Sequence, residues 1–323
     1  MGSRNLDVIV LGELNIDLVL WEVPMPENEK EKLANDMRFT MGSSSAITAH
    51  NLSAMGSKVG FIGKAGRDNF GNFMIKQLRT GGVDTSRIIQ DDSLKTGATI
   101  VLANPPKKAL LTYMGAMSEM TINDIDWDYV AQARHLHLGC YYLQTGLIPD
   151  VPKIFTKAKE LGLSTSFDTN WDPSEKWSKD LYRVFEFTDI FLPNDEEAIC
   201  IAHADSLDKS INILTKMVKI LAIKRGKQGA TLCVNNEVFE APGFSVNAIE
   251  TTGAGDSFNA GFLHKYLSGA EWTDCLRFGN ACGALAATAL GGTGAFQDKR
   301  NMRKQLKRIL NGGISPDKNY SRA

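Results

Sequence analysis

The sequence predicts an α/β protein of three layers, in which a central, mainly parallel sheet is covered by helices on both faces. Strand-like apolar runs alternate with segments of helical periodicity along most of the chain, which is the pattern of parallel strands joined by crossover helices. Two stretches, roughly residues 15–41 and 96–115, interrupt this alternation with strand-like pieces that we expect to pair into a small antiparallel sheet. That sheet would be a lid and not a second domain, so residues 1–323 are expected to form one domain.

The first part of the chain supplies elements with recognisable ends. Residues 6–12 form a β-branched run that a glycine stops, and residues 59–63 form another. Between them, residues 44–55 carry apolar side chains at helical spacing, with serines available as an N-cap and Gly56 as a C-terminal stop. A second amphipathic helix is expected at residues 70–78.

The later elements follow the same rhythm after one hairpin. Residues 97–103 and 109–114 are rich in β-formers and flank a polar stretch, which predicts that hairpin. Strand-like runs then lie at residues 136–138, 163–168, 190–192, 220–224 and 231–234. Helices are expected at residues 152–161 and after Gly255 and Trp272, and the polar residues 312–323 are expected to be loose.

Composition and charge exclude several classes of protein. Hydrophobic residues make up 43% of the 323 and charged residues 23%, which is enough apolar material for a sizeable core. The net charge of −1 gives no support to nucleic-acid or membrane-surface binding, which needs excess positive charge. No signal-peptide pattern or long apolar stretch is present, and the five cysteines lack metal or redox spacing. A cytoplasmic protein is therefore expected.

The sharpest chemical signal is the segment 251–258, Thr-Thr-Gly-Ala-Gly-Asp-Ser-Phe. Its glycines lead into a helical run whose first N–H groups lack intrahelical partners, so the turn predicts an anion site for a phosphoryl group. We expect Gly253 and Gly255 to adopt backbone conformations that other residues avoid. Asp256 would repel the anion, and this conflict indicates a base for a substrate hydroxyl; an ordinary acidic first turn is the alternative. The glycine fingerprint of dinucleotide folds and the Walker loop are absent from the sequence.

This segment resembles the C-terminal signature of the ribokinase-like (phosphofructokinase B type) carbohydrate kinase family, and other segments match that family in order. The matching segments are residues 42–47 with Gly56, 63–71, 81–84, Asn194 with Glu197, 224–230 and 251–258. The similarity runs from about residue 6 to residue 296 and implies a ribokinase-like fold.

The resemblance assigns catalytic and nucleotide-binding roles. Asp256 would take the proton from the substrate hydroxyl, and Gly253, Ala254 and Gly255 would form the anion hole. The residues implied to bind ATP are Asn194, Glu197, Lys224, Gly226, Gly229 and Asn280. Glu197 would also organise Mg²⁺, mainly through water, because magnesium keeps several waters. Without the resemblance, Asn194 and Glu197 are equally well interpreted as helix-capping residues, and Lys224 as a solvated charge.

The resemblance also implies an acceptor site, with departures from the family pattern. Asp17 would bind substrate hydroxyls together with Asn15, Gly42 and Ser43, although Asp17 can also be interpreted as a turn residue. Ser43 stands where the family has a glycine, and Ile47 where it has an asparagine that contacts sugar, so the pocket is expected to be less polar.

Two further departures concern charge. Glu250 stands where the family often has an aspartate that helps to hold a monovalent cation, so a potassium requirement stays open. Asp172 replaces an arginine that is typical of 2-keto sugar acid kinases.

The implied reaction is transfer of the γ-phosphoryl group of ATP to a hydroxyl of a small carbohydrate of the ribose, fructose or keto sugar acid type. A nucleoside kinase of the same fold and a non-catalytic, ligand-sensing derivative are the alternatives, and Asp256 speaks against the second. The expected partner is a sugar, with no nucleic acid or membrane, and a homodimer through the lid is left open.

Overall fold

A nine-stranded sheet runs through the centre of the protein. The structure is a computed structural model that describes residues 4–104 and 107–312. In spatial order the strands are β13 (Glu237–Ala241), β12 (Ala230–Val234), β11 (Ile220–Lys224), β10 (Ile190–Phe191), β9 (Ser164–Phe167), β8 (Ala133–Leu138), β1 (Leu6–Leu11), β4 (Val59–Gly66) and β5 (Asp84–Asp91). All neighbours from β11 to β5 pair in parallel, and the antiparallel pairings are those of β12 with β11 and with β13, so the predicted, mainly parallel sheet is confirmed.

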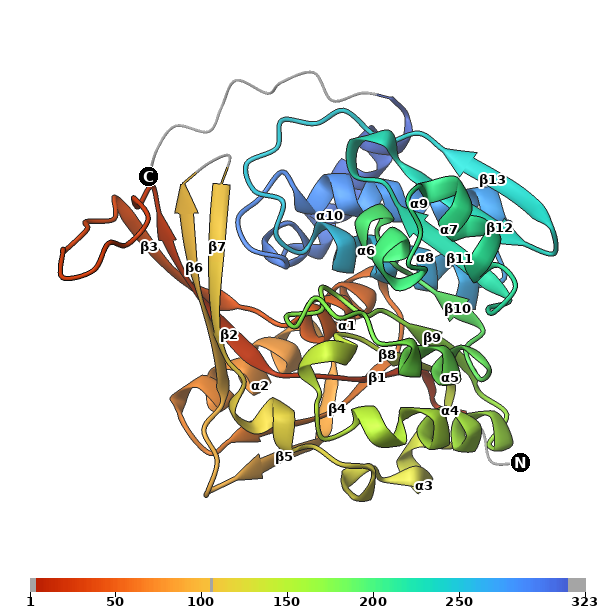
Figure 1. Ribbon diagram of the computed structural model, residues 1–323, viewed down its shortest axis with the longest axis horizontal. Helices are drawn as coiled ribbons and strands as arrows, with labels where there is room; N and C mark the ends of the chain where they lie inside the picture. Colours follow the sequence, from red (N-terminus) through yellow and green to blue (C-terminus); the bar gives the residue numbers. More distant parts are fainter. Residues whose placement is uncertain (1–3, 105–106, 313–323) are drawn as a thin grey trace.

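Helices cover both faces of this sheet because its strands are apolar on both sides. In β1, Val8 and Val10 join one hydrophobic core, whereas Ile9 and Leu11 join the other. The first core is covered by α1 (Ser44–Met55), α2 (Asn69–Gly81), α8 (Ala254–Leu267) and α9 (Trp272–Ala286). The second is covered by α3 (Trp127–Val130), α4 (Val151–Glu160), α5 (Tyr182–Phe185), α6 (Asp195–Ile201) and α7 (Leu207–Leu214). The three predicted layers are visible in Figure 1.

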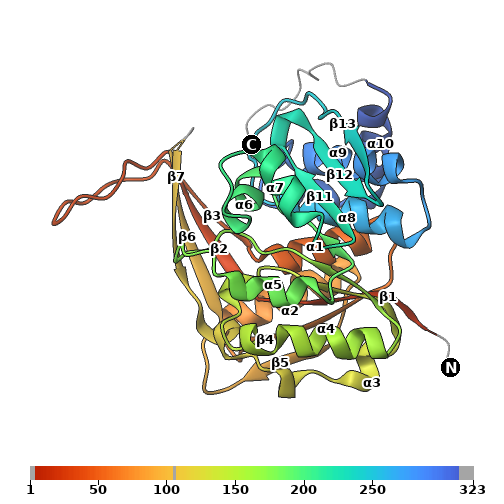
Figure 2. The ribbon, with the colours of Figure 1, turned by 45° about the vertical axis from the view of Figure 1, so that its right-hand side comes forward.

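A second sheet of four strands stands beside the large one, at the left of Figures 1 and 2. Its order is β3 (Asp36–Met41), β2 (Asn15–Trp21), β6 (Gly97–Asn104) and β7 (Lys107–Tyr113). The prediction of an antiparallel sheet is wrong for its central pair, because β2 and β6 run parallel. Each follows a parallel strand of the large sheet, β1 or β5, after a short link, so both leave that sheet in the same direction.

Sequence reasoning missed several elements, among them two strands and one long helix. Strands β5 and β13 lie at the two edges of the large sheet, where most side chains are exposed or half-buried, and this weakens the apolar signal. Helix α10 (Lys299–Leu310) was also missed, although its buried residues Met302, Leu306 and Ile309 have helical spacing. The prediction of a loose tail concerns residues that lie, apart from Gly312, outside the described part of the chain. Within the described residues, no helix combines the length and the apolar character needed to span a bilayer.

Candidate active site

The predicted site residues converge at one edge of the large sheet. Parallel strands end at the same edge, where Asn194 follows β10 and Lys224 is the last residue of β11. Two residues that were not predicted, Glu13 and Asp168, follow β1 and β9 at this edge. The amino end of α8 brings Asp256 to the same place, since a Cβ atom on the preceding residue, Gly255, would lie 3.7 Å from Nζ of Lys224. Residues far apart in the sequence thus form one cluster.

The turn that begins α8 uses its two glycines differently. Gly253, the N-cap residue, has φ 75°, and a Cβ atom there would lie 2.4 Å from Cα of Gly292. Only glycine fits this position. The same expectation for Gly255 is wrong: its φ is not positive, and a Cβ atom there would lie 3.7 Å from Nζ of Lys224, an ordinary contact. Gly255 therefore keeps open the space beside the Lys224 ammonium and does not serve an unusual backbone angle.

Asp256 is buried, unlike an ordinary acidic residue of an exposed first helical turn. Asp256 is only 9% exposed. Burial raises the pKa of Asp256 to about 7, the Asp168 carboxylate acts in the same direction, and Lys224 opposes both. A carboxyl group with a pKa near neutrality is suited to accept a proton at physiological pH.

Lys224 lies in a buried cluster and is not a solvated charge. Its Nζ donates to Oδ2 of Asp168 at 2.8 Å and to Oδ1 of Asn259 at 3.3 Å. The Nδ2 group of Asn259 donates to the same Oδ2 of Asp168. The adjacent charge of Lys224 lowers the pKa of Asp168 despite the burial of that carboxyl group. The sequence alone does not reveal this pairing, since the partners of Asp168 are 56 and 91 residues away.

Asn194 and Glu197 form a capping box at the start of α6, as the simpler interpretation predicts. Oδ1 of Asn194 accepts from the Glu197 amide and Oε2 of Glu197 accepts from the Asn194 amide, both at 2.8 Å. Burial raises the pKa of Glu197 to about 7, while Lys224 lowers it. No cluster of three potential metal ligands occurs in the described ranges. One carboxylate beside phosphates and waters still fits Mg²⁺, which seldom uses an all-protein cage.

The predicted nucleotide loop follows β11 and has two glycines with positive backbone angles. Gly226 has φ 53° and Gly229 has φ 99°, and a Cβ atom on Gly229 would lie 2.0 Å from the carbonyl oxygen of Ala241. Asn280 donates from Nδ2 to the carbonyl oxygens of Ala241 at 2.9 Å and Pro242 at 3.2 Å. Asn280 thus fixes the end of β13, and its contact with adenine stays a prediction.

The predicted acceptor residues meet on one face of the small sheet. Nδ2 of Asn15 donates to Oδ1 of Asp17 at 3.1 Å and to Oγ1 of Thr99 at 3.2 Å. A Cβ atom on Gly42 would lie 2.2 Å from Oδ1 of Asp17, so the glycine makes room for that carboxylate. Burial and the charges of Glu250 and Glu13 raise the pKa of Asp17 to about 7, whereas Lys108 lowers it. Asp17 lies within strand β2, so its interpretation as a turn residue is wrong.

The departures from the family pattern have structural explanations. Ser43 is the N-cap of α1 with φ 68°, which accounts for a glycine at this place in the family. Its hydroxyl accepts from the Ala46 amide at 2.9 Å and donates to the carbonyl oxygen of Glu13 at 2.6 Å. Ile47 is buried, and its Cδ1 would be 3.4 Å from a Cβ atom on Gly253, so it forms an apolar wall beside the anion turn.

Two glutamates complete the surroundings. Glu13, which sequence reasoning missed, is 1% exposed, and its carboxylate accepts from the amide (3.1 Å) and the hydroxyl of Ser45. Its position directly after a buried strand was the signal that could have found it. Oε2 of Glu250 accepts from the Gly291 amide at 2.9 Å, which ties two loops together. Monovalent-cation binding by Glu250 stays a prediction.

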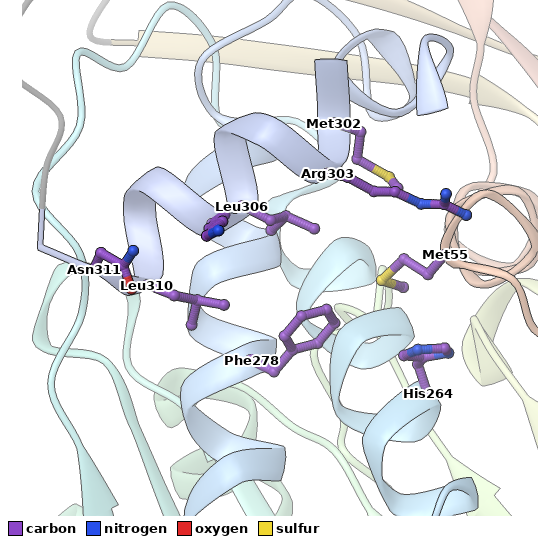
Figure 3. Close-up of a pocket in the computed structure, with 9 residues that line it drawn as sticks. Met55, His264, Phe278, Met302, Arg303, Leu306, Leu310 and Asn311 are labelled. Atoms are coloured by element: carbon purple, nitrogen blue, oxygen red, sulfur yellow. The ribbon is translucent and has the colours of Figure 1, made fainter. Parts of the chain in front are cut away.

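A cavity of about 260 Å³ lies away from this cluster, between α1, α8, α9 and α10 (Figure 3). Its lining residues are Met55, His264, Phe278, Met302, Arg303, Leu306, Lys307, Leu310 and Asn311. These differ from all the predicted catalytic, substrate and nucleotide residues. We therefore assign this cavity no part in the reaction.

Comparisons with known proteins agree with this geometry. The family model described as pfkB family carbohydrate kinase matches residues 5–299. A protein of Pyrococcus horikoshii that carries the name sugar kinase is 30% identical over 301 residues, which cover 90% of this chain and 92% of that protein. A fructokinase-5 of Arabidopsis thaliana is 26% identical, with 93% and 97% covered.

Among solved structures, the Escherichia coli protein described as ribokinase II, in complex with ATP and Mg²⁺, superposes with a TM-score of 0.82. It is 24% identical to this chain, and the alignment covers 94% of this chain and 99% of that one. This likeness shows the fold. Together with the family match over nearly the whole described sequence, it leads to one conclusion: the chain belongs to the pfkB family of carbohydrate kinases and is an ATP-dependent carbohydrate kinase.

Proposed function

We propose that the protein transfers the γ-phosphoryl group of ATP to a hydroxyl of a small, uncharged sugar, with Asp256 as the general base. The observation that carries this proposal is the position of Asp256: its carboxyl group is buried at the amino end of α8, near the Lys224 ammonium. One element thus presents a proton acceptor and unpaired helix amides together. A phosphoryl acceptor hydroxyl needs the first, and a transferring phosphoryl group needs the second.

Each group has a defined part in the reaction. Asp256 takes the proton of the sugar hydroxyl as its oxygen attacks, a contribution of about 10²- to 10⁴-fold. The amides of Gly255 and Asp256 and the Lys224 ammonium stabilise the negative charge on the phosphoryl oxygens, whereas the Ala254 amide donates to the carbonyl oxygen of Thr251 at 3.2 Å. Glu197 would hold Mg²⁺ through water, and the ion would neutralise charge on the phosphates when bound. The small sheet is a lid that excludes water, a competing acceptor.

The charges at the acceptor end favour an uncharged sugar. Glu250 and Glu13 already raise the pKa of Asp17, so an anionic acceptor would meet further repulsion there, offset only in part by Lys108. Asp172, which replaces the arginine of keto sugar acid kinases, accepts from the amides of Ser174 and Trp177, both at 2.8 Å, and caps its own loop. An anion-binding role for position 172 is thus unsupported.

An acceptor panel tests the proposed substrate class. Formation of ADP from MgATP is measured with pentoses, hexoses, keto sugar acids, sugar phosphates and nucleosides, and products are identified by phosphorus NMR. We expect a phosphosugar from a neutral pentose or hexose with the highest kcat/KM. A preference for sugar acids would contradict the electrostatic argument, and a preference for nucleosides would favour a nucleoside kinase of the same fold.

Asp17→Ala is expected to raise the KM for the sugar by roughly 10- to 100-fold and to leave ATP binding nearly unchanged. A charge-assisted hydrogen bond to a sugar hydroxyl is worth about 1.5–3 kcal/mol, and each 1.4 kcal/mol is about tenfold in affinity. The measurement is steady-state kinetics with each substrate varied in turn. Equal loss of affinity for both substrates would assign Asp17 a structural role, through its bond with Asn15.

The face of the lid opposite Asp17, part of which packs on α2 through Phe39, supports a homodimer. The side chains of Met37, Phe39, Ile100, Leu111 and Tyr113 share this face and are 38–64% exposed, an unusual amount of apolar surface. We expect Leu111→Glu to convert a dimer to a monomer in sedimentation experiments, and a wild-type protein that sediments as a monomer would exclude this arrangement.

The five cysteines, all unpaired, are consistent with a reducing cytoplasm.

A further inference from the structure

Asp168 lies beside the reacting groups, yet the mechanism above leaves it without a role. It directly follows β9 and is 1% exposed. Lys224 ends β11, and β10 lies between these two strands. The two side chains therefore reach toward each other past the end of β10, and Nζ of Lys224 lies 2.8 Å from Oδ2 of Asp168.

The carboxylate of Asp168 is held at both oxygens. Oδ1 accepts from the Asn170 amide at 3.1 Å, and Oδ2 accepts from both Lys224 and Asn259. Asn259 belongs to α8 and stands three residues after Asp256, on the same side of the helix. The cluster thus connects two strand ends of the sheet with the helix that carries the base.

Stability is a weak explanation for this pair. Removing two charges from water costs free energy that their attraction only partly offsets, and well-packed apolar side chains would often be as stable. The Lys224 side chain is 12% exposed and faces the site, because a Cβ atom on Gly255 would lie 3.7 Å from its Nζ. An ammonium has three N–H donors, and Asp168 and Asn259 take two of them among the described residues. The third donor is available for a phosphoryl oxygen on the side of Gly255.

We propose that Asp168 is a positioning residue for phosphoryl transfer: its carboxylate fixes the Lys224 ammonium beside Gly255, where this ammonium stabilises the transferring phosphoryl group. The inference rests on the proposed function and adds a residue to it. Asp168 itself touches neither substrate. It determines where the positive charge of Lys224 lies, and a misplacement of about 1 Å in such a group can cost about 10²-fold in rate.

A double-mutant cycle tests this role. Asp168→Asn removes the charge and keeps the size of the side chain, and Lys224→Met removes the ammonium and keeps most of its length. We expect each single variant to lose about 10²-fold in kcat, with the KM for the sugar changed by less than about threefold. In the Lys224→Met background, Asp168→Asn should lower kcat by less than about a further threefold, because the group through which Asp168 acts is gone.

Asp189→Asn is the matched control. Asp189 precedes β10 at the opposite edge of the sheet, and its carboxylate pairs with Lys159 and, at 3.1 Å, with Lys219. This variant breaks a comparable Asp–Lys pair, so it should lower the melting temperature while kcat per folded molecule stays native. All rates are normalised to the folded fraction from circular dichroism. If Asp168→Asn does not fold, Asn259→Ala replaces it, with an expected loss of several-fold that disappears in the Lys224→Met background.

The outcomes separate the inference from the proposed function. Near-native kcat in folded Asp168→Asn protein would overturn the inference, as would losses for Asp168 and Lys224 that multiply in the double variant. Neither result affects the proposed function, which depends on acceptor-dependent turnover by the wild-type protein and its loss in an Asp256 variant.

Discussion

Asp256→Asn should lower kcat by about 10²-fold or more while ATP binding is preserved or strengthened. The amide keeps the shape of the side chain and one hydrogen-bonding oxygen, but it cannot accept the proton of the sugar hydroxyl. The removal of a carboxyl group near the phosphoryl site also removes a source of repulsion for ATP. Steady-state kinetics and isothermal calorimetry with ATP measure the two effects separately.

The burial of Asp256 adds a stability effect with a definite sign. An exposed charge in a first helical turn would hardly affect stability, but Asp256 is only 9% exposed. Its pKa is raised from 3.8 to about 7 in the folded protein, so between these values the native state binds more protons than the unfolded state. The contribution of Asp256 to stability therefore falls as pH rises through this window. Thermal melts should show Asp256→Asn becoming more stable relative to wild type from pH 4 to pH 7.

A control variant separates catalysis from helix capping. Asp298 caps α10, where its Oδ1 accepts from the amides of Arg300 at 2.9 Å and Asn301 at 3.0 Å, and α10 carries none of the predicted site residues. Asp298→Asn should keep native kcat, because asparagine is also a good N-cap. Near-native kcat in Asp256→Asn as well would reduce Asp256 to a structural acid.

Gly255→Val should lower kcat for phosphoryl transfer by about 10²-fold or more in a protein that remains folded. A Cβ atom there makes only an ordinary contact with Lys224, and the valine methyl groups would extend into the space beside its ammonium. That space is where the phosphoryl group is expected, so the added bulk misplaces the reacting atoms. The variant is assayed for kcat and ATP affinity, with circular dichroism to confirm its fold.

Gly253→Ala is the companion variant, and its main expected effect is on stability. Its φ of 75° and the 2.4 Å distance to Cα of Gly292 mean that even one methyl group strains the backbone. A lower melting temperature is expected for Gly253→Ala and a native one for Gly255→Ala. Full activity in folded Gly255→Val protein would show that the phosphoryl group lies elsewhere.

The large sheet could be predicted from the sequence because short local patterns encode its strands and the helices between them. Runs such as residues 59–63 are buried on both faces of the sheet. Helix α1 begins after its N-cap Ser43 and ends before its C-cap Gly56. The parallel pairing of β2 with β6 could not be predicted, since it joins residues about 80 apart and depends on how both strands leave the large sheet. Edge strands β5 and β13 were missed because each has only one buried residue, which leaves little apolar signal.

In the candidate site, too, local features could be predicted from the sequence and long-range contacts could not. The turn at residues 251–258 and the Asn194–Glu197 spacing are local patterns, and both were identified from the sequence. The partnership of Asp168 with Lys224 and the burial of Glu13 are tertiary facts that no short pattern encodes. The raised pKa of Asp256 likewise depends on burial and on Asp168, which is distant in sequence.

A single-turnover experiment tests most directly whether Asp256 is the base. Enzyme saturated with γ-labelled ATP is mixed with the best acceptor sugar, and label transfer is followed by rapid quench for the wild-type protein and Asp256→Asn. This measures the chemical step without product release. We predict rapid transfer by the wild type and a transfer rate at least about 10²-fold lower for the variant, with equal amounts of ATP bound. Equal transfer rates for the two proteins would contradict the account.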